Sequence, residues 1–375
     1  MRELRRFGKS VRVILTKGAG QFVSSLNFEA LGAERVYLDS EQFGVDSKGV
    51  SLHLSLSRWA DAIVIAPASA DFISKVSLGF ADGLSYVAIL AHGLRKNVFI
   101  APAMNNKMWE NPITQRNVEI LKRMGVIFIG PDNGELADGS IGKGRLSEVS
   151  KIAQTVVFSM NRDGPLSDKK VVVACGATKE YIDPVRFITN GSSGLLGSLI
   201  AMHAKLLGAN VHLIAGSVRV KLPYVDKITF VETTEDLLTE TRKAFDNADI
   251  LIMSAAPVDF KPERTSKSKI KKLENLEFKL VSTPDILKNI SHKKGKKIIV
   301  GFALQTEELE KNAIKKMKEK NMDIVVANSP KNIGSESGSA ILMDKDGNKK
   351  RLINMTKDEI AVEILNFLKE YMDRR

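Results

Sequence analysis

Residues 183–197 read Asp-Pro-Val-Arg-Phe-Ile-Thr-Asn-Gly-Ser-Ser-Gly-Leu-Leu-Gly, between a strand-like run and an apolar segment with helical periodicity. Asn190, Ser192 and Ser193 are candidate N-caps of that helix, and the glycines beside them let backbone N–H groups approach an anion at the helix start. The stretch therefore predicts a phosphate-holding loop. A polar, glycine-rich turn is equally typical of any doubly wound domain, so the neighbouring residues must decide.

Residues 171–178, Val-Val-Val-Ala-Cys-Gly-Ala-Thr, form a buried-strand pattern that ends in a glycine turn upstream of this loop. The order of strand, Asp-Pro-Val-Arg, Asn-Gly-Ser-Ser-Gly and helix is specific. On these residues the second half of the chain resembles phosphopantothenate-cysteine ligases. The whole chain resembles the bifunctional coenzyme A biosynthesis proteins, in which a phosphopantothenoylcysteine decarboxylase precedes the ligase, and the resemblance covers nearly all 375 residues.

Length and composition favour a two-domain globular protein, because 375 residues exceed one ordinary core. Hydrophobic residues make up 43% and charged residues 27% of the chain. No run approaches the roughly 20 apolar residues of a membrane span, and the polar start does not resemble a signal peptide. Cys175 is the single cysteine, which excludes an internal disulfide. These features predict a cytoplasmic protein without a membrane partner.

The net charge of +12 is concentrated in residues 261–320, which hold 17 Lys or Arg against 8 Asp or Glu. The segment lacks aromatic interleaving and every common nucleic-acid-binding signature. A lysine-rich solvated surface is the simplest interpretation. Because these lysines neighbour the loops described above, we expect some of them to face a polyanionic small molecule, and we expect no nucleic-acid partner.

The first half of the chain alternates strand and helix patterns, with one helix expected over 20–31. Its expected strands cover residues 11–16, 62–66, 97–101 and 126–130. This order predicts a parallel sheet covered on both faces, with ligands at the carboxyl ends of its strands. Two polar loops fall at such ends, residues 67–71 and residues 102–109.

Residues 161–168 are rich in turn formers, so we expect a linker there between domains 1–160 and 169–375. The second domain repeats the alternation, and a closing helix is expected over 357–371. Its expected strands lie near 169–174, 210–215, 249–254, 297–302 and 323–327. Asp346-Gly347 between two apolar runs predicts a hairpin. The predicted fold class is α/β, with two doubly wound, Rossmann-like parallel-sheet domains.

The resemblance to the ligases implies activation of the phosphopantothenate carboxylate by CTP, followed by attack of the cysteine amine on an acyl-cytidylate. Asn190 matches the residue placed at the acyl group, where its amide would donate to the carbonyl oxygen. Lys269, in Lys-Ile-Lys-Lys at 269–272, matches the catalytic lysine. A lysine run by itself is usually a solvated surface, and only the resemblance favours a site here.

Further ligase residues are implied as contacts to the acid, the phosphates or the nucleoside. They are Arg186, Ser192, Ser193, Ala256, Asp259, Lys271, Phe302, Lys316, Lys320 and Asn328. For Lys316 and Lys320, the polar face of an amphipathic helix is nearly as good an interpretation. The nucleotide implies Mg²⁺, which binds phosphates with few protein ligands, so no protein metal site is expected.

The resemblance to the decarboxylases implies FMN in a flavodoxin-like domain. His53 matches the catalytic histidine, Asn105 would bind the substrate carboxylate, and Met104 would shape the pocket. The Pro-x-Met-Asn-x-x-Met-Trp pattern at 102–109 is highly specific. The expected cofactor contacts are Thr16, Pro67, Ser69, Ala70 and Met104, and Arg145 is expected to meet an anionic group of the substrate.

Two departures from the decarboxylases suggest impaired turnover. The chain starts in what should be the first helix, so we expect the first strand and its phosphate-binding turn to be missing. Asp138 stands where the flap of the relatives carries a proton-donating cysteine. An ordinary aspartate pKa of about 3.9, against about 8.5 for cysteine, leaves Asp138 ionised at neutral pH unless burial raises it strongly.

The sequence therefore predicts a homo-oligomeric enzyme that ligates phosphopantothenate and cysteine with CTP, and that decarboxylates the product with FMN. Two alternatives remain open at this point. The first domain could be only an oligomerisation scaffold for a ligase, or the chain could be a nucleotide-binding regulatory protein without turnover. Flavin absorption would test the first alternative, and substrate-dependent pyrophosphate release would test the second.

Overall fold

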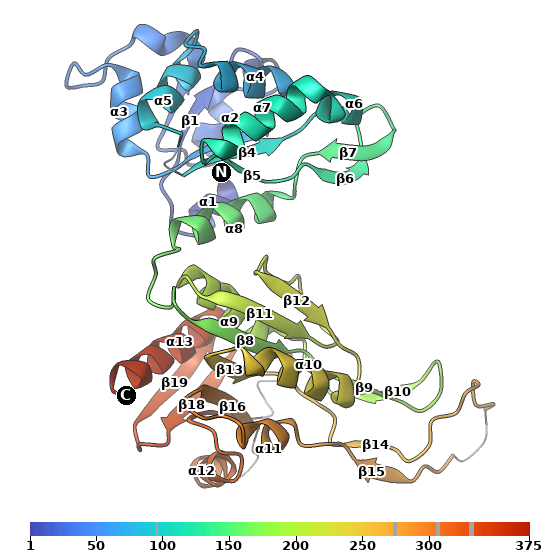
Figure 1. Cartoon of the computed structure of the whole chain (residues 1–375). Helices are drawn as coiled ribbons and strands as arrows, with labels where there is room; N and C mark the ends of the chain where they lie inside the picture. Colours follow the sequence, from blue (N-terminus) through green and yellow to red (C-terminus); the bar gives the residue numbers. More distant parts are fainter. Residues whose placement is uncertain (95–96, 273–275, 305–307, 330–333) are drawn as a thin grey trace. The chain divides into compact units, whose positions relative to one another are not determined.

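The computed structural model describes residues 1–94, 97–272, 276–304, 308–329 and 334–375 (Figure 1). The chain forms two compact units, Met1–Met160 and Asn161–Arg375. Within the described ranges, no helix is both long and apolar enough to cross a membrane.

The C-terminal unit is built on one eight-stranded sheet with the order β12-β11-β8-β13-β16-β17-β18-β19. The first six strands in this order are parallel to one another. Strand β18 runs antiparallel to β17, and β19 runs antiparallel to β18. The strands are β8 (Lys170–Cys175), β11 (Asn210–Ala215), β12 (Lys227–Phe230), β13 (Ile250–Met253), β16 (Ile298–Leu304), β17 (Ile324–Asn328), β18 (Ser337–Asp344) and β19 (Lys349–Thr356). From β8 the successive strands β11 and β12 are added on one side and β13, β16 and β17 on the other, so the strand order reverses between β8 and β13, which is where doubly wound sheets bind ligands.

Alternation along the strands divides the core of this unit into two layers. Val171, Val173 and Cys175 face one helical layer, and Val172 and Ala174 face the other. The first layer contains α9 (Leu195–Leu206) and α13 (Lys357–Asp373), and the second contains α10 (Thr234–Asp246), α11 (Ile286–Ser291) and α12 (Leu309–Glu319). The expected strands, the hairpin and the closing helix are confirmed, whereas β12 has no counterpart among the expected strands.

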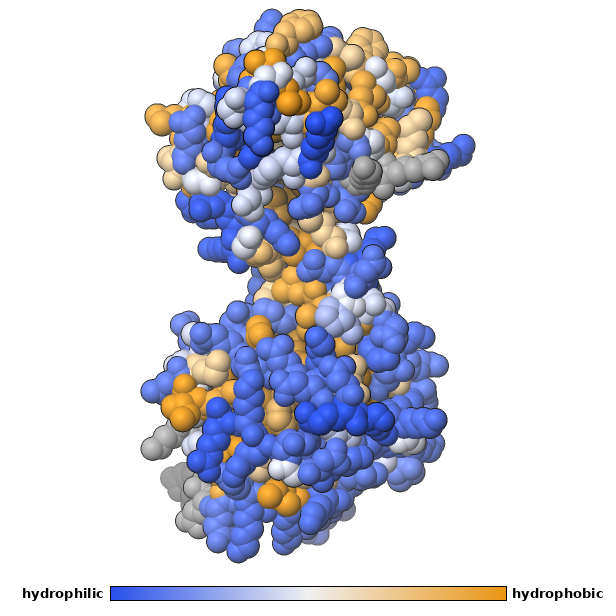
Figure 2. Space-filling view, turned by 90° about the vertical axis from the view of Figure 1, so that its left-hand side faces the viewer, coloured by the Kyte–Doolittle hydropathy of each residue, from blue (hydrophilic) through white to orange (hydrophobic). Residues whose placement is uncertain are grey.

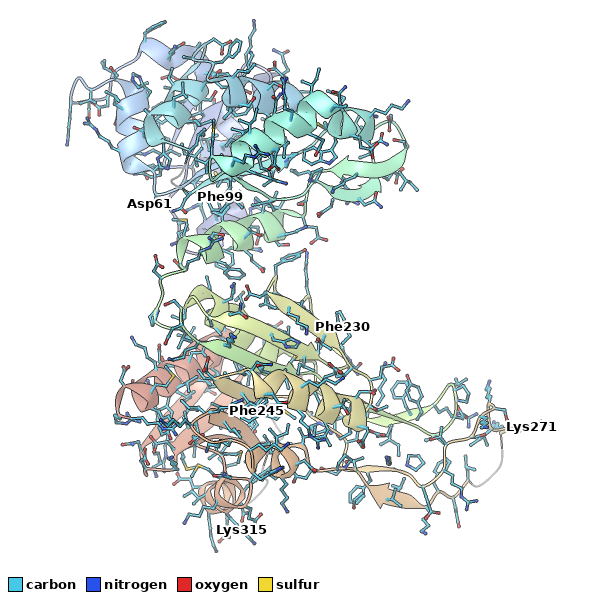
Figure 3. The ribbon with its side chains drawn as sticks, in the orientation of Figure 1. Asp61, Phe99, Phe230, Phe245, Lys271 and Lys315 are labelled. Carbon is cyan, nitrogen blue, oxygen red and sulfur yellow. The ribbon has the colours of Figure 1, made fainter. Side chains whose placement is uncertain are left out.

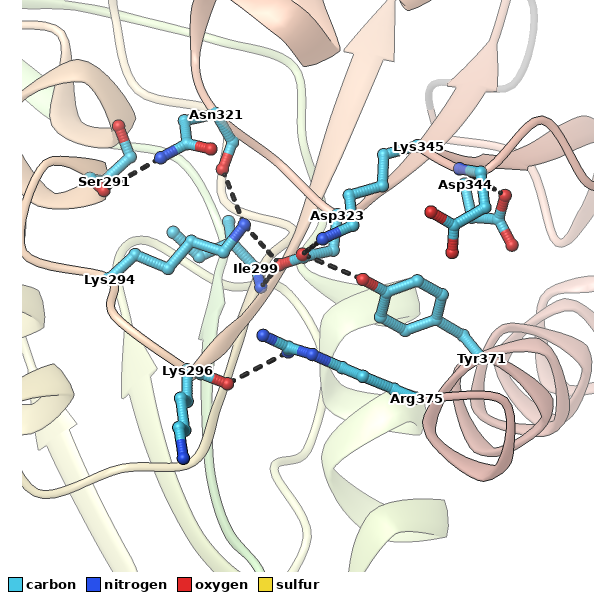
Figure 4. A network of polar contacts seen from close by, with 11 residues as sticks. Ser291, Lys294, Lys296, Ile299, Asn321, Asp323, Asp344, Lys345, Tyr371 and Arg375 are labelled. Carbon is cyan, nitrogen blue, oxygen red and sulfur yellow. Dashed lines mark hydrogen bonds and ion pairs between the residues drawn. The ribbon is translucent and has the colours of Figure 1, made fainter.

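A buried polar cluster fastens α13 to the sheet (Figure 4). The Asp323 carboxylate is inaccessible to solvent and pairs with Lys294 Nζ at 2.7 Å, while Tyr371 Oη donates to it at 3.0 Å. It also accepts the backbone N–H of Ile299 at 2.8 Å. Desolvation lowers the pKa of Lys294, and the neighbouring Asp323 opposes that shift. A buried charge pair of this kind is costly to break on one side only.

Two short antiparallel hairpins extend beyond this sheet (Figure 1). One pairs β9 (Lys179–Tyr181) with β10 (Phe187–Thr189), and the other pairs β14 (Phe260–Pro262) with β15 (Leu280–Ser282). They contact each other through β9 and β14. The Asp-Pro-Val-Arg turn and the lysine-rich loop therefore lie at the ends of these hairpins.

The N-terminal unit contains two parallel sheets. One joins β3 (Ile63–Ala68), β4 (Val98–Pro102) and β5 (Ile127–Phe128), and the other joins β1 (Arg12–Leu15) and β2 (Arg35–Leu38). A hairpin of β6 (Asp132–Glu135) and β7 (Ile141–Arg145) follows. The helices are α1 (Arg2–Arg6), α2 (Ser25–Ala30), α3 (Leu52–Trp59), α4 (Ala70–Leu78), α5 (Leu84–His92), α6 (Asn106–Glu110), α7 (Pro112–Arg123) and α8 (Val149–Met160).

The buried strand β4 separates two apolar clusters of this unit. Val98 and Ile100 belong to one cluster, and Phe99 and Ala101 to the other. The sequence pattern predicted this two-sided burial, and the α/β class with parallel sheets is confirmed. We expected a single sheet, but among the described residues no strand ladder joins β1 to β3.

One further expectation needs correction. The helix expected over 20–31 is a short 3-10 turn at Ala19–Gln21 followed by α2, because the extended backbone of Ser24 interrupts it. Residues 161–168, the expected linker, belong to the compact C-terminal unit. Leu166 is fully buried and its backbone N–H donates to the Leu207 carbonyl at 2.8 Å, so this segment packs onto the C-terminal unit.

The surfaces of the two units differ on the face shown in Figure 2, where the C-terminal unit is mostly hydrophilic. Large apolar side chains are exposed on the N-terminal unit. Phe22 and Phe43 are 89% and 92% exposed, and Leu26 and Leu78 are also mostly accessible.

Candidate functional site

The predicted phosphate-holding loop lies where α9 packs directly on the end of β8. A Cβ atom added at Gly197 would lie 2.5 Å from the Cβ of Cys175, so only glycine permits this approach. Cys175 is fully buried, and burial raises its pKa to about 12. Cys175 is therefore a packing residue, which agrees with the absence of a catalytic pattern around it in the sequence.

The expected N-caps of α9 are wrong. The N-cap is Gly194, whose φ of 78° lies in the left-handed region. The hydroxyls of Ser192 and Ser193 accept hydrogen bonds at 3.3 Å from the N–H groups of Gly194 and Leu195. The two serines thus shape the turn that leads into the helix, and Asn190 lies further upstream.

Asn190 links two loops of the site. Its Nδ2 donates to the Pro257 carbonyl at 2.9 Å and to the Ala256 carbonyl at 3.3 Å. The structure therefore brings Asn190 together with Ala256. The amide donor assigned to the acyl carbonyl contacts backbone carbonyls instead, so Asn190 holds the loop after β13 beside β10.

A buried polar network that sequence reasoning missed lies beneath this link. Thr178 Oγ1 lies 2.9 Å from Thr234 Oγ1 and accepts the Val258 N–H at 2.9 Å. The Thr178 carbonyl accepts from Thr189 Oγ1 at 2.7 Å. Glu180 is also buried, and it accepts the Thr234 N–H at the start of α10 at 2.8 Å. Thr178 thereby fixes the positions of the loops on both sides of Asn190.

The lysine loop, residues 269–272, is attached to the Asp-Pro-Val-Arg turn. Arg186 Nη2 donates to the Ile270 carbonyl at 2.9 Å, and Asp183 Oδ2 accepts the Ile270 N–H at 3.1 Å. Lys269 and Lys271 are exposed on either side of this attachment, and Figure 3 places Lys271 at the far end of the hairpins. In the described part of the chain, no hydrogen bond or ion pair joins the lysine loop to Asn190.

Lys316 and Lys320 are not on the solvated face of α12. Lys320 Nζ pairs with Asp285 at 2.8 Å. Desolvation lowers the pKa of Lys316, and the positive charge of Lys320 lowers it further, while Asp285 and Asp259 oppose the shift. Lys315, by contrast, has 75% of its side chain exposed (Figure 3). The structure therefore gathers Lys316, Lys320 and Asp259 near the start of α11.

The remaining ligase candidates lie near the carboxyl ends of the central strands. Phe302 of β16 is half-buried and packs against the core on the α9 face. Asn328 ends β17 and is also half-buried. Both residues lie near the carboxyl ends of their strands, on the same side of the sheet as the loop after β13.

In the N-terminal unit, a pocket of about 450 Å³ lies between the end of β4 and the β6–β7 hairpin. Four predicted residues line it: Met104, Asn105, Asp138 and Arg145. Asn105 caps α6, because its Oδ1 accepts the Lys107 N–H at 2.9 Å. Its Nδ2 donates to Asp138 Oδ2 at 2.5 Å. The structure thus joins two of the predicted catalytic positions directly.

Asp138 is exposed on this hairpin. The hydroxyl and the backbone N–H of Ser140 donate to its carboxylate at 2.6 and 3.1 Å, and these bonds hold the pKa of Asp138 below its ordinary value. Burial therefore does not turn Asp138 into an acid that is protonated at neutral pH.

The other decarboxylase candidates do not line this pocket. His53 lies in the first turn of α3, and its Nδ1 is buried without a hydrogen-bond partner in the described structure. Ser69 caps α4, Ala70 begins that helix, and Pro67 is exposed near the end of β3. Thr16 follows β1 and its hydroxyl accepts the Ala19 N–H at 3.1 Å. These residues lie at carboxyl ends of parallel strands or at helix starts.

No group of three or more His, Cys, Asp or Glu side chains gathers to hold a metal ion within the described ranges.

Sequence reasoning proposed candidate residues at strand ends but assigned no role to Thr178, Glu180 or Asp183. A polar residue at the end of the glycine turn that follows the buried strand β8 was the available signal for Thr178.

Comparisons with known proteins cover both units. The Flavoprotein family matches residues 1–161, and the DNA/pantothenate metabolism flavoprotein C-terminal domain family matches residues 166–372. The coenzyme A biosynthesis bifunctional protein CoaBC of Bacillus subtilis (strain 168) is 38% identical over 371 residues, which cover 97% of this chain and 90% of that protein. The protein of the same name from Escherichia coli (strain K12) is 31% identical over 374 residues, covering 97% of this chain and 91% of that protein.

A crystal structure of the C-terminal domain of a CoaBC protein is also similar to this chain. It is 33% identical, has a TM-score of 0.50, and the match covers 56% of this chain and 100% of that one. The matched families and relatives agree with the resemblance that the motifs suggested. The chain therefore belongs to the family of the coenzyme A biosynthesis bifunctional protein CoaBC.

Proposed function

We propose that the C-terminal unit joins 4′-phosphopantothenate to cysteine with CTP, and that the N-terminal unit decarboxylates the phosphopantothenoylcysteine formed. The observation that carries this proposal is the presence of both family domains in one chain, at 38% identity to a bifunctional relative over 97% of the chain. The link of Asn190 to the loop after β13 supports the proposal of a ligase site at the switch point of the sheet.

In the ligase reaction, the acid and CTP form an acyl-cytidylate and release pyrophosphate, and the cysteine amine then displaces CMP. We assign the acyl group to the loops that Asn190 joins. Ser192, Ser193, Lys269 and Lys271 are assigned to the phosphates with Arg186, Lys316 and Lys320. The nucleoside is assigned to Ala256, Asp259, Phe302 and Asn328. Mg²⁺ enters with the nucleotide, bound mainly by phosphate oxygens.

The ligase is tested by measuring the release of pyrophosphate from CTP in the presence of Mg²⁺. We expect a single burst with phosphopantothenate alone and continuous release only when cysteine is also present. A protein that binds CTP but releases no pyrophosphate with both co-substrates would instead be the nucleotide-binding regulator that the sequence left open.

In the decarboxylase, we assign FMN to the strand ends that carry Thr16, Pro67, Ser69, Ala70 and Met104. The residues fit a flat cofactor, because Pro67 and its neighbour Ala66 are exposed although they belong to a strand. When bound, FMN supplies two-electron oxidation of the cysteinyl thiol and later returns the electrons. His53 is assigned to proton transfer at the thiol, and its buried, unpartnered Nδ1 is consistent with a group that awaits a ligand.

The substrate carboxylate is assigned to Asn105, and Arg145 to an anionic group of the substrate. Loss of carbon dioxide leaves an enethiol, which needs a hydride (two electrons and a proton) and one further proton to become phosphopantetheine. Asp138 is an exposed, hydrogen-bonded carboxylate, and it therefore lacks a proton to donate at neutral pH. We accordingly propose that this chain returns the proton slowly and forms phosphopantetheine incompletely.

We also propose that β1 and β3 flank one strand position of a single flavodoxin-like sheet. The orders β2-β1 and β3-β4-β5 are the two halves of a doubly wound sheet on either side of its central strand.

The exposed Phe22 and Phe43 support assembly of the N-terminal units into a homo-oligomer. We expect light scattering to give a mass of at least two chains, and F22E/F43E to lower it. A parental protein that stays at the mass of one chain at high concentration would remove this proposal.

A further inference from the structure

Asp183 occupies a position that the proposed ligase chemistry does not explain. It is completely buried, although it lies in the exposed Asp-Pro-Val-Arg turn between β9 and β10. Its Oδ1 accepts the N–H groups of Val185 and Arg186, each at 2.8 Å, which fixes the turn itself. The second oxygen is directed elsewhere.

That second oxygen, Oδ2, accepts the N–H of Ile270 at 3.1 Å across 87 residues of sequence. Arg186 Nη1 lies 3.7 Å from the same oxygen, and its Nη2 donates to the Ile270 carbonyl at 2.9 Å. Both backbone polar groups of Ile270 are therefore held by the turn, directly between Lys269 and Lys271.

Two further contacts attach the segment just before the lysine loop, at residues 265 and 266, to the end of β9 and the residue after it. The Ser266 N–H donates to the Ile182 carbonyl at 2.9 Å, and Thr265 Oγ1 donates to the Tyr181 carbonyl at 3.0 Å. The loop is consequently bonded to the turn at three residues. Only Asp183 supplies a buried charged group to this attachment, and charge-assisted bonds are about twice as strong as neutral ones.

We propose that Asp183 is a positioning residue of the ligase, which fixes Ile270 so that the flanking Lys269 is presented to the nucleotide phosphates. This inference rests on the proposed ligase function and on the role of Lys269 in it. Displacing a reacting group by about 1 Å can cost on the order of 10² in rate, so loss of this attachment should slow acyl-cytidylate formation without removing any group that touches substrate.

The decisive variant is D183N, which keeps the shape of the side chain but removes the charge. If the amide oxygen of the new side chain takes the Oδ1 position and preserves the turn, the NH₂ group takes the Oδ2 position. Two donors then face each other, and the hydrogen bond from the Ile270 N–H is lost. We expect the pyrophosphate burst to slow by about 10² in rate, with the dissociation constant for CTP changed far less than the rate. T265V, on the exposed side of the loop, should slow the burst by only about 2-fold to 5-fold.

Asp344 provides a matched control. It is also buried, accepts two turn N–H groups at 3.0 and 2.8 Å, and pairs with Arg374 at 2.8 Å, but it lies at the β18–β19 turn. D344N should lower the melting temperature comparably and leave the burst at the parental rate. Equal slowing in D183N and D344N would show that Asp183 acts only through stability.

A double-mutant cycle separates this inference from the proposed function. We expect D183N/K269Q to be no slower than K269Q, because a displaced loop matters only through its lysine. Multiplied losses in the double variant would overturn the positioning role. A parental burst rate in K269Q would remove Lys269 from the site and the inference with it. An inactive parental protein would contradict the proposed ligase itself.

Trypsin provides a readout that does not depend on activity. Cleavage after Lys269, Lys271 and Lys272, followed by mass spectrometry, should be at least about 10-fold faster in D183N than in the parental protein and in D344N. Unchanged cleavage in D183N would show that Asp183 does not hold the loop.

Discussion

The two units differ in how continuous their β-sheets are and in how deeply the polar residues of their candidate sites are buried. The C-terminal unit has one continuous eight-stranded sheet, and the polar residues that support its site, such as Thr178 and Asp183, are fully buried. The N-terminal unit has separate sheets of two and three strands, and its Asp138 and Arg145 are exposed. Buried hydrogen bonds cost more to lose than exposed ones. Substitutions beneath the ligase site should therefore have larger effects than comparable changes in the decarboxylase half.

The largest effect is expected at the buried anchor of α13. D323N leaves Lys294 without its charge partner, and we expect about 3 to 5 kcal/mol lower stability of the C-terminal unit. Calorimetry should show its transition shifted and that of the N-terminal unit unchanged. The control E310Q removes an exposed carboxylate that pairs with Lys349 and Arg351, and should cost less than about 1 kcal/mol. Similar losses in both variants would contradict the comparison.

A nearly equal effect, on rate instead of stability, is expected for N190D. The new carboxylate would face the carbonyl oxygens of Ala256 and Pro257, repel them and present a negative charge to the acyl group. We expect formation of phosphopantothenoylcysteine to fall by about 10² to 10³, with folding retained by circular dichroism. Ligation by N190D at the parental rate would remove Asn190 from the site.

A smaller loss is expected for T178V, which has nearly the same shape but leaves the Val258 N–H unsatisfied. We expect about 1 to 3 kcal/mol of lost stability and a ligase rate lowered by roughly 10-fold, whereas T178S should restore both. T16V is the matched change in the N-terminal unit, where the hydroxyl also accepts one backbone N–H, and it should have a weaker effect. Equal destabilisation by both threonine changes would contradict the proposed difference.

The smallest expected change is a gain, in D138C. The hydrogen bonds from Ser140 lower the pKa of the parental carboxylate, so it is ionised at neutral pH and acidification from pH 8 to 6 should not improve the phosphopantetheine yield. A thiol with a pKa of about 8.5 is protonated below that pH, so D138C should raise the yield several-fold at pH 7 and lose the gain above about pH 9. Mass spectrometry of the product against pH would test this, and a parental yield that rises on acidification would contradict it.

Sequence patterns predicted the parts of the fold that bury continuous apolar runs. The strands β8, β13 and β16 are mostly buried, predominantly apolar runs, and their short length and their content of Val and Ile indicate buried strands. The short strands β2 and β12 were missed because they are exposed at edges and contain charged residues. The cap of α9 was misassigned because Gly194 takes the left-handed conformation that turns the chain, and composition does not reveal which glycine does so.

Candidate site residues could be proposed from the sequence where a residue follows a strand or carries a specific motif, as for Asn190, Met104 and Asn105. The supporting contacts were not, because each joins segments that are distant in the sequence. Thr178 contacts residues 56 and 80 positions away, and Asp183 contacts one 87 positions away. Only the three-dimensional fold brings such partners together, and no local pattern encodes them.

The most direct test of this account uses the full chain with phosphopantothenate, cysteine, CTP and Mg²⁺, and then with phosphopantothenoylcysteine and excess FMN under anaerobic conditions. Pyrophosphate, carbon dioxide and phosphopantetheine are quantified. We predict many turnovers of ligation, and less phosphopantetheine than carbon dioxide because Asp138 does not return the proton. Equal, multiple-turnover yields of carbon dioxide and phosphopantetheine would contradict the account.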